Sequence, residues 1–154
     1  MGVKLFLLSS LLMTSCGKNF NDFINKKGNP KKHKTHLDFY PYIDLFEQYY
    51  GEIKTPIIYG NAGDNENWVG KCTTWTSGYK EITIDKTYWD NASESARNQL
   101  ILHELGHCEF NRRHDDTFFN GCPNSVMTSY VFNYNSLENC FIPDFIYYVN
   151  ELLK

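Results

Sequence analysis

The chain has 154 residues, which is room for one domain with a single hydrophobic core, and its 42% hydrophobic content argues against a disordered protein. Charge is uneven along the chain. Residues 17–37 carry six Lys and one Asp, whereas the part from residue 38 onward carries eight Lys or Arg against seventeen Asp or Glu, a net charge of −9. Because the main part is acidic, we expect no nucleic-acid partner.

The first fifteen residues have the pattern of an export signal. Lys4 precedes a short apolar run, Leu5 to Met13, which is too short for a bilayer core that takes roughly 20 residues. Small residues then precede Cys16, as in a bacterial lipobox, although Met13 replaces the commoner Leu. We predict a lipoprotein signal peptide over residues 1–15 and lipidation of Cys16; an ordinary signal peptide cut elsewhere is the alternative. Gly17 is not the Asp that retains some lipoproteins at the inner membrane, which favours the outer membrane or cell surface.

Residues 16–37 are rich in Asn, Lys and Gly, which predicts a lipidated tether ahead of a folded domain over residues 38–154. Apolar residues recur at helical spacing between Pro41 and Gly51, which predicts the first helix of that domain. Thr55–Tyr59 is a short strand candidate.

A β-hairpin is predicted next, with strands Lys71–Trp75 and Tyr79–Asp85 on either side of Ser77-Gly78. A helix then begins near Asn91 or Ser93, which are rival capping residues. A last helix opens near Pro143, with apolar residues along its inner face. These elements predict an α+β fold in which a small mixed sheet is covered by helices.

The central motif is His103-Glu104-Leu105-Gly106-His107, which lies within the predicted middle helix. Two histidines four residues apart lie on the same face of a helix, so both imidazoles can reach one metal ion. Glu104 is then placed to act as a general base on a water molecule. His114 follows seven residues after the second histidine and is the candidate third ligand, with Asp115 or Asp116 as alternates.

At these residues the chain resembles the metzincin zinc metallopeptidases, which carry HExxHxxGxxH and a downstream turn with a methionine beneath the metal. His103, Glu104 and His107 match the first part of that motif, and Ser125-Val126-Met127 resembles the Met-turn. The resemblance implies that the metal is Zn²⁺ and that residues 38–154 form a metallopeptidase domain.

The sequence departs from the metzincin motif after the second histidine. Phe110 replaces the family's glycine, and His114 comes one residue late. Asn111 is the residue that could supply the left-handed turn in place of glycine. Tyr130 lies three residues after Met127, where some metzincins have a tyrosine two residues after, and is a candidate oxyanion donor. A gluzincin alternative would take Glu138 as the third ligand.

Four cysteines remain after Cys16 is set aside: Cys72, Cys108, Cys122 and Cys140. An even number in an exported protein predicts two disulfides, with three possible connectivities. We favour a Cys108–Cys122 bridge because it would restrain the segment that carries His114. A cysteine ligand to the metal is the alternative.

Together these features predict a monomeric zinc endopeptidase that is exported, anchored to a membrane by lipid, and acts on protein or peptide substrates. Two alternatives stay open: a metal-binding lipoprotein that does not catalyse, and an adhesin built on a peptidase-like fold. The presence of Glu104 favours the enzyme, since a site without turnover has no need of a base.

Overall fold

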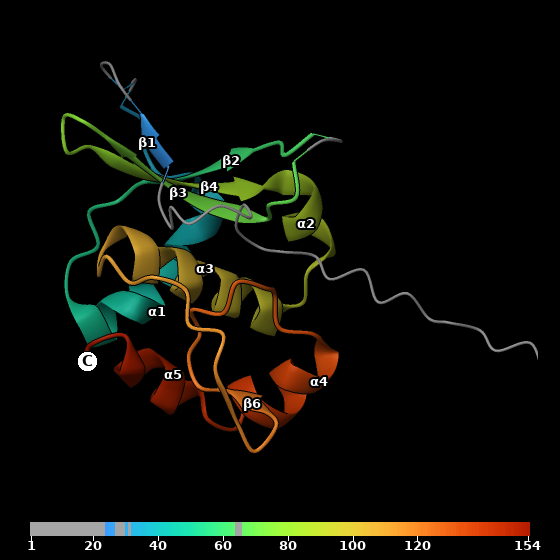
Figure 1. Ribbon diagram of the computed structural model, residues 1–154. Coiled ribbons are helices and arrows are strands. Elements are labelled where there is room, and N and C mark those ends of the chain that lie inside the picture. The colour runs from blue at the N-terminus through green and yellow to red at the C-terminus, as the bar shows by residue number, and fades with distance from the viewer. Residues whose placement is uncertain (1–23, 27–29, 31, 64–65) are drawn as a thin grey trace, which may run out of the picture.

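The computed structural model describes residues 24–26, 30, 32–63 and 66–154. The predicted signal peptide and Cys16 lie outside these residues. The described part is an α+β fold with a mixed sheet, as predicted, and this sheet has four strands (Figure 1). Among the described residues, no helix has both the length and the apolar content needed to cross a membrane.

The sheet has the strand order β1-β3-β4-β2. Strands β3 (Gly70–Trp75) and β4 (Lys80–Asp85) form the predicted antiparallel hairpin, and β2 (Ile57–Gly60) lies parallel to β4. The remaining strand, β1 (Ile24–Lys26), pairs in parallel with β3. The sheet is therefore mixed, and β3 and β4 are its two central strands.

Part of the predicted tether belongs to this fold. Strand β1 lies within residues 16–37, and the backbone N–H of His36 donates to the carbonyl of Ile57 at 2.9 Å. His33 Nδ1 also lies 2.5 Å from Glu81 Oε2 on β4. The folded region thus begins before residue 38, where composition had placed the boundary. The reason is physical: a strand's hydrogen bonds come from its partner strand, which the composition of a polar segment does not reveal.

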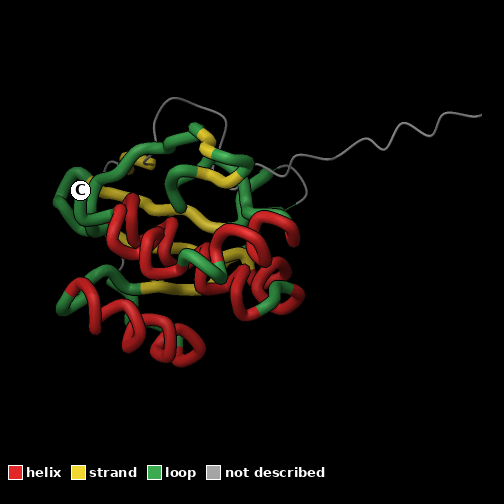
Figure 2. Tube along the Cα trace, turned by 90° about the horizontal axis from the view of Figure 1, so that it is seen from below, coloured by secondary structure: helices red, strands yellow, loops and turns green. Residues whose placement is uncertain are grey.

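Three helices accompany the sheet. Helix α1 (Tyr40–Tyr50) comes between β1 and β2 in the sequence, and α2 (Lys86–Asn91) and α3 (Glu94–Cys108) follow β4. In a view from below, the helices lie in front of the strands (Figure 2). Helix α3 packs against β3 and β4 and is the most buried helix. The core between these elements consists of buried apolar side chains, including Phe39, Phe46, Ile57, Ile82, Ile84, Leu100, Ile101, Leu102 and Leu105.

The C-terminal segment lies on the side of α3 that faces away from the sheet (Figure 1). It contains a small antiparallel pair, β5 (Phe118–Phe119) and β6 (Cys122–Pro123), the short helix α4 (Tyr134–Ser136), and the last helix α5 (Phe145–Glu151). A single π-helical turn, Leu137–Phe141, continues from α4. Helix α3 is therefore enclosed on both sides, which makes it a rigid support for a site.

Two disulfides restrain this arrangement. Cys72–Cys108 joins β3 to the last residue of α3, and Cys122–Cys140 joins β6 to the π-helical turn. The favoured Cys108–Cys122 pairing is therefore wrong, and so is a cysteine ligand. The Cys108 side chain faces the sheet, where its Sγ lies 3.8 Å from the Glu81 carbonyl oxygen, so it points away from β6.

Candidate metal and catalytic site

Helix α3 carries the central motif, and its sequence explains where it begins. The Ser93 hydroxyl accepts a hydrogen bond from the backbone N–H of Ala96 at 3.2 Å, so Ser93 is the capping residue. Asn91, the rival cap, lies instead at the end of α2, a helix that sequence reasoning missed. Asp85 caps α2, because its side chain accepts a hydrogen bond from the Tyr88 backbone N–H at 2.7 Å. An aspartate at the end of a strand is a common helix cap, and it was the sequence feature that could have predicted α2.

The three residues of the motif that carry chemistry are fully buried. His103, Glu104 and His107 each have 0% exposed surface. Burying an imidazole or a carboxylate is costly unless the group is held by other polar groups or by a metal. These three residues therefore belong to a site rather than to an ordinary apolar core.

The chain turns sharply after α3 to bring His114 back to the helix. Asn111 has φ of 53°, the left-handed conformation predicted for it in place of a glycine. Lys80 supports the turn, because its Nζ donates to the Cys108 carbonyl at 2.5 Å and to Asn111 Oδ1 at 2.9 Å. The Arg112 backbone N–H also donates to the carbonyl of Gly106 at 2.9 Å. This turn thus accommodates the additional residue between His107 and His114.

The turn brings His103, His107 and His114 together, and we call these three residues the histidine cluster. Nε2 of His107 lies 3.1 Å from Nε2 of His103 and 3.1 Å from Nε2 of His114. The ligand atoms of all three residues lie within 4.8 Å of one another. Two nitrogens that each bind zinc at 2.0–2.1 Å in a tetrahedral site lie about 3.3 Å apart, so the cluster has the dimensions of a zinc site.

Two backbone carbonyls fix the orientation of the helical histidines. Nδ1 of His103 donates to the Val126 carbonyl at 2.9 Å, and Nδ1 of His107 donates to the Arg112 carbonyl at 2.8 Å. A carbonyl can only accept, so each Nδ1 carries a proton, and in a neutral imidazole the Nε2 then presents its lone pair to the cluster. Burial lowers the pKa of His103 well below its usual value, and the neighbouring histidines lower it further. Neutral imidazoles with converging lone pairs are a donor set for a divalent cation.

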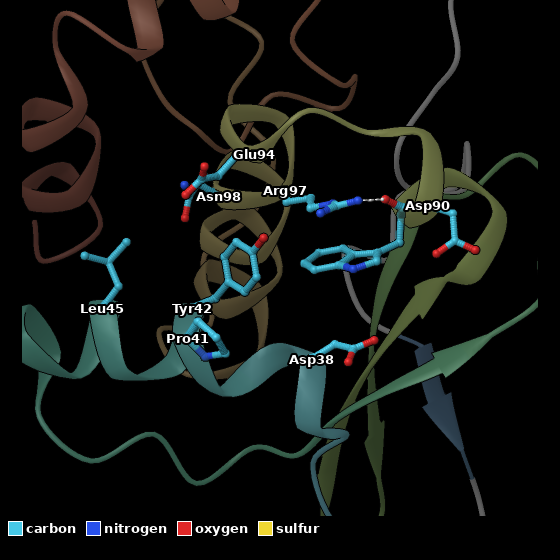
Figure 3. Close-up of a pocket in the computed structure, with 9 residues that line it drawn as sticks. Asp38, Pro41, Tyr42, Leu45, Asp90, Glu94, Arg97 and Asn98 are labelled. Atoms are coloured by element: carbon cyan, nitrogen blue, oxygen red, sulfur yellow. Dashed lines mark hydrogen bonds between the residues drawn. The ribbon is translucent and has the colours of Figure 1, made fainter.

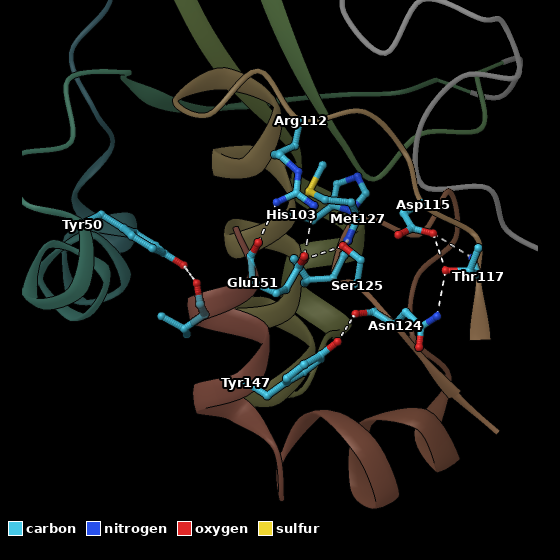
Figure 4. A network of polar contacts seen from close by, with 12 residues as sticks. Tyr50, His103, Arg112, Asp115, Thr117, Asn124, Ser125, Met127, Tyr147 and Glu151 are labelled. Atoms are coloured by element: carbon cyan, nitrogen blue, oxygen red, sulfur yellow. Dashed lines mark hydrogen bonds and ion pairs between the residues drawn. The ribbon is translucent and has the colours of Figure 1, made fainter. Parts of the chain in front are cut away.

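Met127 packs against α3 at Gly106, which lies between His103 and His107 in the helix. Its side chain is fully buried, and its Sδ contacts Gly106 so closely that a Cβ on that glycine would collide with it. The Met127 carbonyl accepts from the Asp115 backbone N–H at 2.8 Å, which ties the turn containing Met127 to the segment carrying His114 (Figure 4). The predicted Met-turn therefore lies next to the histidine cluster.

The carboxylate of Glu104 lies against the first residue of β3. An ideal Cβ placed on Gly70 would be 2.6 Å from Glu104 Oε1 and 2.9 Å from its Cδ. Gly70 therefore provides the space that the carboxylate occupies. Sequence reasoning missed Gly70, because no local signal connects a glycine at the start of a strand with a glutamate on a helix further along the chain.

The alternate metal ligands are engaged elsewhere. Asp115 Oδ1 accepts hydrogen bonds from the Thr117 N–H at 3.0 Å and the Thr117 hydroxyl at 2.6 Å, and these bonds lower the pKa of Asp115. Asp116 accepts from the backbone N–H and hydroxyl of Ser129, at 2.6 and 2.9 Å. Glu138 is exposed on the π-helical turn and is outside the cluster.

Tyr130 lies beside the segment that carries the third histidine. Its ring stacks on Phe118 with centroids 5.9 Å apart and an interplanar angle of 6°. Its hydroxyl is buried and has no hydrogen-bond partner among the described residues. Burial raises the pKa of Tyr130, and the charge of Asp116 adds to this. The hydroxyl is therefore a protonated donor for which the described part of the chain supplies no acceptor.

A separate cavity of about 440 Å³ lies at the amino-terminal half of α3, between α1 and α2 (Figure 3). Its lining combines charged residues such as Asp38, Glu94 and Arg97 with the ring of Trp89. The Arg97 guanidinium donates to the Trp89 carbonyl from Nε at 3.0 Å and from Nη2 at 2.8 Å, so its position is fixed. No residue of the histidine cluster lines this cavity.

Comparisons with known proteins agree with the chemistry of the cluster. A search of curated proteins and a search of solved structures each gave no significant match. A family of proteins described as "Putative phage metallopeptidase" does match, over residues 17–129, a range that contains the whole histidine cluster and Met127. Since this match covers about three quarters of the chain, the protein belongs to that metallopeptidase family.

Proposed function

We propose that this protein is a zinc-dependent endopeptidase that hydrolyses peptide bonds in protein or peptide substrates. The observation that carries the proposal is the convergence of three imidazole Nε2 atoms, 3.1 Å apart in two pairs, beside the buried carboxylate of Glu104. Membership of a metallopeptidase family supports the same reaction class.

The number of ligands favours a catalytic metal site over a structural one. Structural zinc sites use four protein ligands, whereas catalytic sites use three and leave a position for water or substrate. Here the described residues supply three histidines and no fourth ligand to the cluster. Three neutral nitrogen donors suit zinc, which binds imidazole readily.

The roles of the side chains follow from their positions. Zinc, when bound, supplies a Lewis acid that polarises the scissile carbonyl and makes water more acidic. Glu104 takes a proton from the attacking water and transfers it to the leaving amine. The Tyr130 hydroxyl, a buried donor without a partner among the described residues, is our candidate for a hydrogen bond to the developing oxyanion.

We further propose that the site is metzincin-like. Support comes from a third histidine that follows the helix after a left-handed turn at Asn111, and from the buried Met127 against Gly106, between the two helical ligands. In the metzincins, a methionine in a turn likewise lies beneath the metal. The proposed third ligand is thus His114, whereas a gluzincin-type site would use a glutamate from a later helix.

The rival to an enzyme is a protein that binds the metal without catalysis. The buried Glu104 favours the enzyme, because its carboxylate stands next to the first histidine of the cluster, where a general base for a metal-bound water is needed. A direct test compares wild type with Glu104→Gln, both loaded with one equivalent of zinc, on casein and a peptide library. We expect zinc in both proteins and cleavage by wild type alone. Zinc in both and cleavage in neither would leave only the binding role.

We also infer from the sequence that the protein is a lipoprotein anchored through Cys16 to the outer membrane or cell surface. The support is the short apolar run followed by small residues before this cysteine. Expression of the full chain in a bacterium with radiolabelled palmitate tests the inference. Label should enter the wild type and be absent from Cys16→Ser, and label retained by that variant would contradict a lipid at this position.

A further inference from the structure

The last helix carries a buried acidic residue that the mechanism above does not use. Glu151 lies at the end of α5 and has 6% exposed surface. It lies outside residues 17–129, the range matched by the family. A buried carboxylate requires hydrogen bonds or a cation to offset its desolvation, so its partners indicate its role.

The first partner of Glu151 is Arg112, in the turn between α3 and His114. Arg112 Nη2 donates to Glu151 Oε2 at 3.1 Å, and its Nη1 donates to the Glu151 backbone carbonyl at 2.7 Å (Figure 4). The guanidinium thus holds both the side chain and the backbone at the end of α5. The backbone carbonyl of the same Arg112 accepts the Nδ1–H of His107. Glu151 therefore restrains the residue that orients the second metal ligand.

The second partner of Glu151 is Ser125, in the turn that contains Met127. The Ser125 hydroxyl donates to Glu151 Oε1 at 2.5 Å and accepts from the Met127 backbone N–H at 3.0 Å. Val126, between these two residues, provides the carbonyl that accepts the Nδ1–H of His103. The other oxygen of the same carboxylate therefore restrains the turn that orients the first metal ligand.

We propose that Glu151 is a positioning residue for the metal site, acting through Arg112 on His107 and through Ser125 on His103. A single carboxylate bridges the two segments whose carbonyls set the tautomer and the ring orientation of both helical ligands. Hydrogen bonds that involve a charged group are about twice as strong as neutral ones, so this bridge resists movement of either segment. The inference rests on the proposed metal-binding function of the histidine cluster.

The side of α5 that reaches the site also contacts α3 directly. An ideal Cβ on Gly106 would be 3.2 Å from Leu152 Cδ2, so the residue after Glu151 packs between the two helical ligands. Apolar packing at this point supports α5 in general, whereas the Glu151 carboxylate accepts hydrogen bonds from the two carbonyl-bearing segments. The two contributions can be separated experimentally.

The experiment measures zinc affinity by competition with a chelator of known affinity, at a temperature where circular dichroism shows every variant to be folded. The variants are Glu151→Ala and the isosteric Glu151→Gln. Val149→Ala is the matched control in the same helix. The Val149 side chain is fully buried, so this substitution removes apolar packing without changing the hydrogen bonds of Glu151. Glu138→Gln is the control for loss of one exposed acidic charge. Absorption spectra of the Co²⁺-loaded proteins report the ligand geometry.

Changes to groups that orient metal ligands typically weaken metal binding about 10- to 100-fold. We expect a loss in that range for Glu151→Ala, a smaller loss for Glu151→Gln, and altered Co²⁺ spectra in both. Val149→Ala should unfold at a lower temperature but keep the zinc affinity and Co²⁺ spectrum of wild type. Glu138→Gln should match wild type in zinc affinity, Co²⁺ spectrum and unfolding temperature.

Three outcomes would overturn a proposal. Wild-type affinity in both Glu151 variants would refute the positioning role, and Glu151→Gln decides alone if Glu151→Ala does not fold. Equal weakening by Val149→Ala and Glu151→Ala would show that α5 contributes only general stability. Wild-type protein that binds no zinc at all would instead refute the proposed function, so the two failures are distinguishable.

Discussion

Gly70→Ala is the substitution that tests the location of the catalytic carboxylate most sharply. The added Cβ would lie 2.6 Å from Glu104 Oε1, whereas ordinary contacts begin near 3.4 Å, so the carboxylate must move by about 0.8 Å. The colliding atoms, Oε1, Cδ and Cγ, all belong to the Glu104 side chain and none to the backbone, so the side chain can shift without unfolding the helix. Displacement of a reacting group by 1 Å can reduce a rate about 100-fold. We therefore expect kcat/KM to fall about 10- to 100-fold.

The assay follows cleavage of a fluorogenic peptide, chosen from library cleavage, by zinc-loaded protein. Zinc content and thermal unfolding should stay close to wild type, since Gly70 does not have the positive φ that would make alanine strained. Gly60→Ala is the matched control: its Cβ would lie 2.5 Å from Thr83 Cγ2 in the sheet, away from Glu104. Full activity in Gly70→Ala, or an equal loss in both variants, would refute the placement of Glu104 described above.

The remaining predictions concern the third ligand, the tyrosine and a disulfide. His114→Ala should weaken zinc binding more than about 100-fold, because even indirect changes cost 10- to 100-fold, whereas Asp115→Asn should leave it unchanged in chelator competition; the reverse order would exclude His114. Tyr130→Phe should lower kcat about 100- to 1,000-fold with KM and zinc content retained, and an unchanged kcat would exclude an oxyanion role. Replacing Cys72 and Cys108 together by Ser should lower the free energy of unfolding in urea by about 4 kcal/mol, from the loop of 36 residues that the bridge closes, and a loss below about 1 kcal/mol would contradict this.

The parts of the site that could be predicted from the sequence are those encoded locally. His103 and His107 are four residues apart within one helix, and helix geometry alone brings them together. Asn111 could be chosen for the left-handed turn because few residue types accept that conformation, and its φ of 53° confirms the choice. Two strand-like segments on either side of Ser77-Gly78 likewise predicted the β3–β4 hairpin, which the register of this pair confirms.

The parts that could not be predicted depend on contacts between distant segments. The pairing of Cys108 with Cys72 follows from the packing of the end of α3 on the sheet, which no spacing of cysteines reveals. Strand β1 takes its conformation from pairing with β3. Glu151 reaches Arg112 across 39 residues of sequence, in a helix whose pattern predicts only an apolar inner face. The candidate metal ligands could therefore be found from local sequence, whereas the groups that orient them could be identified only from the folded structure.

The most direct test of the central claim is the rate of peptide cleavage as zinc is added stepwise to metal-free protein. If the histidine cluster holds a single catalytic metal, the rate should rise from zero and reach a plateau at one equivalent of zinc. Cleavage by the metal-free protein, or zinc binding to saturation without cleavage of any peptide in the library, would contradict the account.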